Sequence, residues 1–175
     1  MRASRRMGHS GAAWFETAKT PPHHEGLSSS ELRRRGYFFM QFDTKIAVII
    51  RTDLEPWQKL NVASFLAGGI AATFPECIGE NYEDGSGTRY LSLIGQPILI
   101  YGADRPALAR ALERALARNV KPAVYTEDMF KTTHDAANRE AVRAVIRGEL
   151  NLVGLAMRAE RKVIDKIVDG LKFHS

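Results

Sequence analysis

Short β-branched runs alternate with longer helical segments along this chain, and this alternation limits the possible folds more than any other feature. The strand-like runs are residues 44–51, 96–103, 121–128 and 151–158. The helical segments are residues 56–74, 104–119, 135–147 and 159–171. Such alternation is typical of an α/β protein whose helices cover both faces of a sheet. We therefore expect a three-layer α/β/α fold with a mixed, largely parallel sheet of about four strands.

The helical segments carry recognisable end signals. Pro56 and Pro106 stand in first turns, where the missing N–H has no helical partner to lose. Asp104 and Asp135 stand where side chains cap helix N-termini. We therefore expect helices to begin at these points.

The first helical segment is unusual because its apolar residues go nearly all the way round. They are Leu60, Val62, Phe65, Leu66 and Ile70. A helix with such a pattern is normally covered on more than one side. The segment NYEDGSGTRYLSL, residues 81–93, predicts a hairpin or extended excursion around its glycines.

The first part of the chain differs in composition from the rest. Residues 1–39 carry seven basic and three acidic side chains, so most of the net charge of +5 resides there. Their mixture of Arg, Ser, Gly and Pro predicts a disordered extension, followed by a single domain over residues 40–175. Three alternatives give this segment a function: a targeting peptide, a nucleic-acid tail, or a metal site at His23 and His24. In a fourth alternative, Met40 is the biological start and these residues have no function.

Composition excludes several classes of protein. Hydrophobic residues make up 45% and charged residues 26%, as in a soluble globular domain. No apolar run approaches the roughly 20 residues that span a bilayer. The single cysteine, Cys77, excludes an internal disulfide. No metal-binding spacing or phosphate-binding loop occurs, so we expect a protein without metal or cofactor. The single cysteine fits a reducing compartment, so we expect a cytoplasmic protein.

Polar residues gather where the first strand gives way to the first helix. Arg51 and Asp53 lie at the carboxyl end of the strand, and Lys59 lies one turn into the helix. In α/β sheets ligands bind beyond the carboxyl ends of the strands, and a helix N-terminus attracts anions. This junction is a candidate site for a phosphate, a carboxylate or an oxyanion. The alternative is a surface ion pair that closes the turn.

A second polar cluster opens the third helical segment. His134 and Asp135 begin it, and Asn138 and Arg139 follow in its first turn. Histidine beside a carboxylate can act as an acid–base pair. The alternative is an aspartate cap beside a histidine that faces solvent.

Several segments resemble known families. KIAVIIRTDLEPWQKLNVA resembles the opening of type II peptidyl-tRNA hydrolases, and NLVGLAMRAERKVIDKIVDGLKF resembles their closing strand and helix. The chain is also similar to a family of small bacterial proteins of unknown function in the same fold superfamily. The recurring segments are Arg51–Leu54, Trp57–Asn61, Tyr125–Phe130 and His134–Arg139. The resemblance covers nearly everything after Met40.

The resemblance implies a peptidyl-tRNA hydrolase II-like fold and part of a hydrolytic site. Lys59 matches the family's lysine and Asp135 its aspartate. The family's glutamine falls on Ala63, and two of its threonines fall on Arg139 and near Asn151. The chain thus retains half of the residues that the family uses.

Two classes of function follow, and the sequence leaves open whether the protein is an enzyme. A divergent hydrolase would cleave an ester or amide on a tRNA- or nucleotide-like substrate. Lys59 would stabilise the oxyanion, and Asp135 with His134 would activate water.

The alternative is a non-catalytic module that binds a small anion or nucleotide, or an oligomeric interaction protein. The expected ligand-binding residues are Arg51, Asp53, Trp57, Asn61, Asn138 and Arg139. The resemblance also implies a homodimer.

Overall fold

The computed structural model describes residues 42–175, and the predictions for residues 1–39 lie outside this range. Five strands form one sheet: β1 (Thr44–Arg51), β2 (Ile98–Ala103), β3 (Ala123–Thr126), β4 (Leu152–Glu160) and β5 (Lys172–Phe173). Four α-helices accompany them in this range: α3 (Pro56–Thr73), α4 (Arg105–Leu116), α5 (Asp135–Arg143) and α6 (Arg161–Ile167). Short 3-10 helices lie at Pro75–Cys77, Glu127–Lys131 and Arg147–Glu149. The α/β class predicted from the sequence is confirmed.

The prediction of a largely parallel sheet is wrong. The strand order is β3-β4-β1-β2-β5, and only β1 and β2 pair in parallel. β4 is antiparallel to both β1 and β3, and β5 is antiparallel to β2. The sheet is therefore mixed but mostly antiparallel, with five strands rather than about four.

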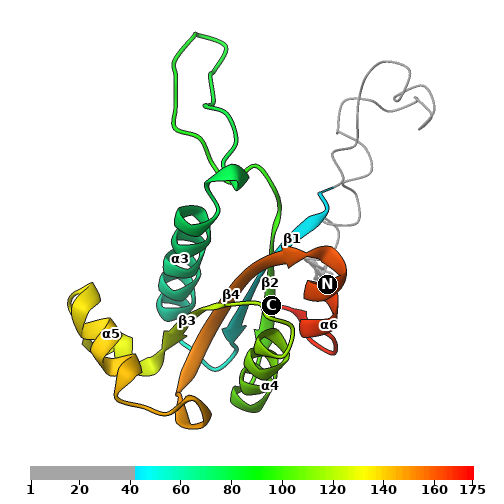
Figure 1. The fold of residues 1–175 in the computed structure, drawn as a ribbon. Helices are drawn as coiled ribbons and strands as arrows, with labels where there is room; N and C mark the ends of the chain where they lie inside the picture. Colours follow the sequence, from blue (N-terminus) through cyan, green and yellow to red (C-terminus); the bar gives the residue numbers. More distant parts are fainter. Residues whose placement is uncertain (1–41) are drawn as a thin grey trace, which may run out of the picture. The chain divides into compact units, whose positions relative to one another are not determined.

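The path of the chain between β3 and β4 explains this difference. Helices α3 and α4 return the chain across the sheet, so β1, β2 and β3 all run in one direction, as the alternation predicts. Helix α5 instead packs against the 3-10 helix that follows β3, beyond the end of the strand (Figure 1). Because α5 makes no return crossing, β4 starts where β3 ends and runs back between β3 and β1.

Two apolar cores lie on opposite faces of the sheet, which confirms a helix layer on each side. The side chains of β1 alternate between them. Ala47 and Ile49 join α4 and α6 in one core, while Ile46, Val48 and Ile50 join α3 in the other. Strand β4 divides in the same way and is buried along most of its length. The continuous apolar runs thus reflect strands covered on both faces.

The caps of the helices agree with the sequence in one case and differ in another. The Asp104 carboxylate accepts from the Ala107 N–H at 2.8 Å, as expected for α4. The expectation that Asp135 caps α5 is wrong, because His134 is the cap and its Nδ1 accepts from the Ala137 N–H at 3.2 Å. An aspartate in the first turn still complements the helix dipole.

Helix α3 is covered on one side by the residues that the structure describes, so the expectation of coverage on several sides is not met within this range. Val62, Leu66 and Ile70 pack on the sheet. Trp57, Leu60 and Phe65 are each 60% or more exposed.

The expected excursion is present as a hairpin-like projection, residues 79–95, which we call the arm. Backbone bonds join its two sides, from Gly79 N–H to Leu93 and from Tyr90 N–H to Tyr82, both at 2.8 Å. Figure 1 shows the arm projecting beyond the C-terminal end of α3. Apart from Ile94, which packs against the core beneath α3, the arm lies outside both apolar cores.

Candidate functional site

The end of β1 holds a closely connected group of polar side chains, here called the Arg51 network: Arg51, Asp53, Glu127 and Asn151. The Arg51 guanidinium donates to Asp53 at 2.6 Å, to Glu127 at 2.8 Å and to Asn151 at 3.3 Å. The Asn151 amide also donates to Glu127 at 2.9 Å. The network therefore ties the end of β1 to the end of β3 and the start of β4.

The charges of the network stabilise one another. The hydrogen bond from Arg51 is the main cause that lowers the pKa of Glu127, and burial opposes it. Burial lowers the pKa of Arg51, but its bonds to Glu127 and Asp53 outweigh that effect and raise it. The Arg51 side chain is only 12% exposed. Its donors are thus directed at protein partners, as in the ion-pair interpretation of this junction.

Lys59 stands apart from this network. It is half-buried in the first turns of α3, and its N–H donates to the Glu55 carbonyl at 3.0 Å. Across residues 42–175, its ammonium makes no hydrogen bond or ion pair. A second bond, from the Glu55 N–H to the Gln58 side chain at 3.0 Å, belongs to the capping box of this helix. Lys59 is therefore a cation without a protein counter-ion in the described range.

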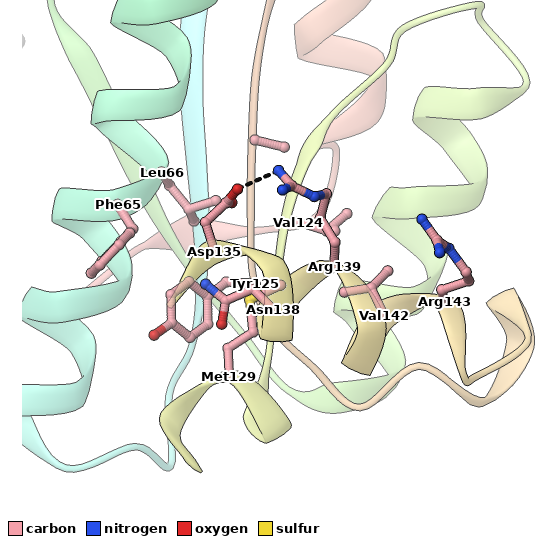
Figure 2. Close-up of a pocket in the computed structure, with 11 residues that line it drawn as sticks. Phe65, Leu66, Val124, Tyr125, Met129, Asp135, Asn138, Arg139, Val142 and Arg143 are labelled. Atoms are coloured by element: carbon pink, nitrogen blue, oxygen red, sulfur yellow. Dashed lines mark hydrogen bonds and ion pairs between the residues drawn. The ribbon is translucent and has the colours of Figure 1, made fainter. Parts of the chain in front are cut away.

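A groove of about 440 Å³ lies between α3, β3 and α5. Its lining is Phe65, Leu66, Ala123, Val124, Tyr125, Met129, Asp135, Asn138, Arg139, Val142 and Arg143. Figure 2 shows Phe65 and Leu66 on α3 opposite the polar residues of α5, with Tyr125 and Met129 between the two helices. One wall is thus apolar and aromatic, and the opposite wall carries charge. Clefts with this division are common ligand sites.

The polar wall of the groove is partly neutralised. Arg139 forms an ion pair with Asp135 one turn earlier on α5 (Figure 2). The Asn138 side chain accepts from the Thr132 hydroxyl. Arg143 makes no ion pair with any residue of the described range and lies further along the same wall. The wall therefore carries one uncompensated positive charge.

Four aromatic side chains join the floor of the groove to the start of α3. The ring of Tyr125 lies 5.9 Å from that of Phe65 and 5.3 Å from that of Phe130, and Trp57 lies 5.7 Å from Phe130. The Tyr125 hydroxyl donates to Asn61 at 3.0 Å, and burial raises the pKa of Tyr125. Trp57 and Asn61 thus support the aromatic floor.

The predicted site residues fall into separate groups. Asp135, Asn138 and Arg139 line one groove, while Arg51 and Asp53 belong to the Arg51 network. Lys59 does not line this groove, and His134 caps α5. The roles assigned to these residues stay predictions.

The sequence analysis missed Glu127 and Arg143 as functional candidates. Glu127 directly follows β3, and Arg51 is the last residue of β1, so both stand at the carboxyl end of a strand; this parallel was the available signal. Arg143 lies one turn beyond Arg139 on the same helix. A spacing of four residues puts two side chains on one helix face, so Arg143 could have been found in this way.

The structure places two limits on the kind of site. In the described range, no three His, Cys, Asp or Glu side chains gather in an arrangement that would hold a metal ion. Residues 42–175 also contain no helix with the length and apolar content needed to cross a bilayer. Both statements concern this range alone.

Comparisons with known proteins give a family and a fold. The family described as "Protein of unknown function (DUF2000)" matches residues 44–175. The chain is 48% identical to Atu0240, a protein of unknown function from Agrobacterium tumefaciens whose structure is solved. That match covers 77% of this chain and 100% of Atu0240, with a TM-score of 0.76. No curated protein matches this chain.

Proposed function

The chain belongs to the DUF2000 family, and we propose that it binds a small ligand that joins an aromatic body to an anionic group, as a nucleotide does. The observation that carries the proposal is the divided groove between α3, β3 and α5. Phe65 and Tyr125 offer ring faces and edges to a planar group. Arg139 and Arg143 offer donors to an anion.

The volume and the lining of the groove support this ligand class. A volume of about 440 Å³ lies within the usual range for small-molecule sites. Stacking of a base on an aromatic side chain contributes roughly 1–3 kcal/mol. A hydrogen bond from a charged donor contributes roughly 1.5–3 kcal/mol. Together these contacts favour a ligand with both parts over either part alone.

Isothermal titration with ADP, adenosine and inorganic phosphate tests the proposal. We expect ADP to bind more tightly than either half, and Phe65→Ala to weaken ADP and adenosine by about tenfold. Ile146→Ala, which shortens an exposed apolar side chain outside the groove, is the matched control and leaves affinity unchanged. Equal or absent binding of all three compounds would contradict the proposal.

Hydrolysis is the second candidate, and Lys59 is the observation that favours it. Its ammonium has no partner in the described range and lies in the first turns of α3, where the helix dipole also favours an anion. In the segment that resembles type II peptidyl-tRNA hydrolases, Lys59 matches the lysine of that family. Asp135, the second matching residue, is occupied by its ion pair with Arg139.

Turnover of peptidyl-tRNA and of a panel of simple esters decides between the two candidates. If the protein is a hydrolase, Lys59→Ala abolishes turnover, while Lys121→Ala on the loop before β3 leaves it unchanged. If the protein is a binding module, ADP binds and none of these substrates is cleaved.

A further inference from the structure

Two apolar surfaces of this chain face solvent although their side chains are large. The first lies on the arm and consists of Tyr82, Tyr90, Leu91 and Leu93, which are 52–86% exposed. The second is the outer face of α3 near its start and consists of Trp57 and Leu60, which are 60% and 70% exposed and do not line the groove. Exposed apolar side chains gathered in this way mark interaction surfaces.

The arm beyond Ile94 keeps its form through hydrogen bonds of its own, without packing on either core. The Asp84 carboxylate accepts from the N–H groups of Ser86 at 2.8 Å and Thr88 at 3.0 Å, and from the Tyr90 hydroxyl at 2.7 Å. Gly87 adopts a positive φ of 82° in the same turn, a conformation that glycine adopts without strain. These bonds hold the apolar side chains in place before any partner arrives, which lowers the entropy cost of binding.

We propose that the partner is a second copy of this chain, with the arm of each protomer packed on the outer face of α3 of the other. A two-fold pairing of this kind uses both surfaces twice and leaves neither exposed. The six side chains together expose on the order of 700 Å², taking each exposed fraction of a typical side-chain area. A standard interface buries about 800 Å² on each partner, so the available area is close to that of a stable dimer.

Length and charge agree with this arrangement. Helix α3 has 18 residues and spans about 27 Å. One side of the arm, from Gly79 to Asp84, extends about 17 Å, which is roughly three turns of a helix. The arm carries three carboxylates, Glu80, Glu83 and Asp84, against the single cation Arg89, whereas α3 carries no carboxylate and one lysine. Opposite charges across the contact favour arm against helix over arm against arm.

Sedimentation velocity of the full chain tests the proposal. We expect a dimer at micromolar concentration, and we expect Leu91→Asp on the arm and Leu60→Asp on α3 each to produce monomers. Ile146→Asp is the matched control, because Ile146 is 69% exposed but belongs to neither surface, and this variant stays dimeric. Circular dichroism confirms that each variant is folded.

A mixing experiment locates the contact directly. Chains carrying Leu60→Cys are mixed with chains carrying Leu91→Cys under oxidising conditions, and the native Cys77 is buried. We expect a disulfide-linked dimer from the mixture and a much lower yield when Ile146→Cys replaces either chain. A monomeric wild-type protein, or a dimer that survives Leu91→Asp, would overturn the proposal. Leu60 and Leu91 do not line the groove, so ligand binding is scored independently.

Discussion

The Arg51 network and the groove are both polar sites near the carboxyl ends of strands, yet they differ in how their charges are used. In the network, the Nε and Nη1 atoms of Arg51 donate to protein acceptors, and the side chain is largely buried. In the groove, one arginine is paired and the other makes no ion pair in the described range, beside an apolar wall. A polar cluster whose bonds are satisfied internally stabilises the fold. One that retains unused charge beside a cavity is suited to binding.

The largest expected effect comes from the residue that sets the position of α3. Gly154 lies on β4 beneath the helix, and a Cβ there would overlap Val62 and lie 2.9 Å from Leu66. We expect Gly154→Val to cost about 3 kcal/mol of unfolding free energy and to weaken ligand binding, because α3 must move. Gly68→Ala is the control: no atom lies within 4 Å of the added Cβ, and it stabilises by up to about 1 kcal/mol.

The next effect separates the two polar sites. Arg51→Met removes the donor to Asp53 and to the Asn151 oxygen and leaves Glu127 with the Asn151 amide alone. It should lower the unfolding free energy by about 1–2 kcal/mol, since Glu127 is 44% exposed and solvent screens the loss. ADP affinity should stay within twofold. Chemical denaturation and titration calorimetry measure the two quantities. The exposed pair of Arg89 and Glu83 on the arm provides the control, because Arg89→Met should change stability by less than about 0.5 kcal/mol.

A smaller effect on the unfolding free energy is expected when the pH is lowered. Because the folded state lowers the pKa of Glu127 below its ordinary value of 4.5, its ionised form stabilises the protein above that pH. This contribution is lost as the pH falls through the lowered pKa. We expect stability to decline less steeply below pH 4.5 in Glu127→Gln than in the wild type. Parallel slopes in denaturation curves across this range would show that Glu127 has no stabilising role.

The sequence indicated that helices cover both faces of the sheet, but it did not indicate the directions of all the strands. β1 and β4 are apolar at successive positions because both faces are covered, and this property is local enough to be read directly. The direction of β4 depends on where α5 packs. That contact, between α5 and the 3-10 helix after β3, leaves no periodic signal in the sequence.

The candidate site was likewise predictable only where its residues are neighbours in the chain. Asp135, Asn138 and Arg139 were singled out because they are neighbours in the chain, and they lie together in the groove. The apolar wall opposite them comes from Phe65 and Tyr125, which looked like ordinary core residues. Only the tertiary structure places these two rings across from α5.

Titration of ADP into the wild type, Arg143→Ala and Arg105→Ala tests the central claim most directly. Arg143 carries the charge on the groove that no ion pair neutralises in the described range, and Arg105 is an exposed arginine at the start of α4. The account predicts binding to the wild type, a loss of at least about tenfold in Arg143→Ala, and unchanged affinity in Arg105→Ala. Equal affinity for all three proteins would contradict it.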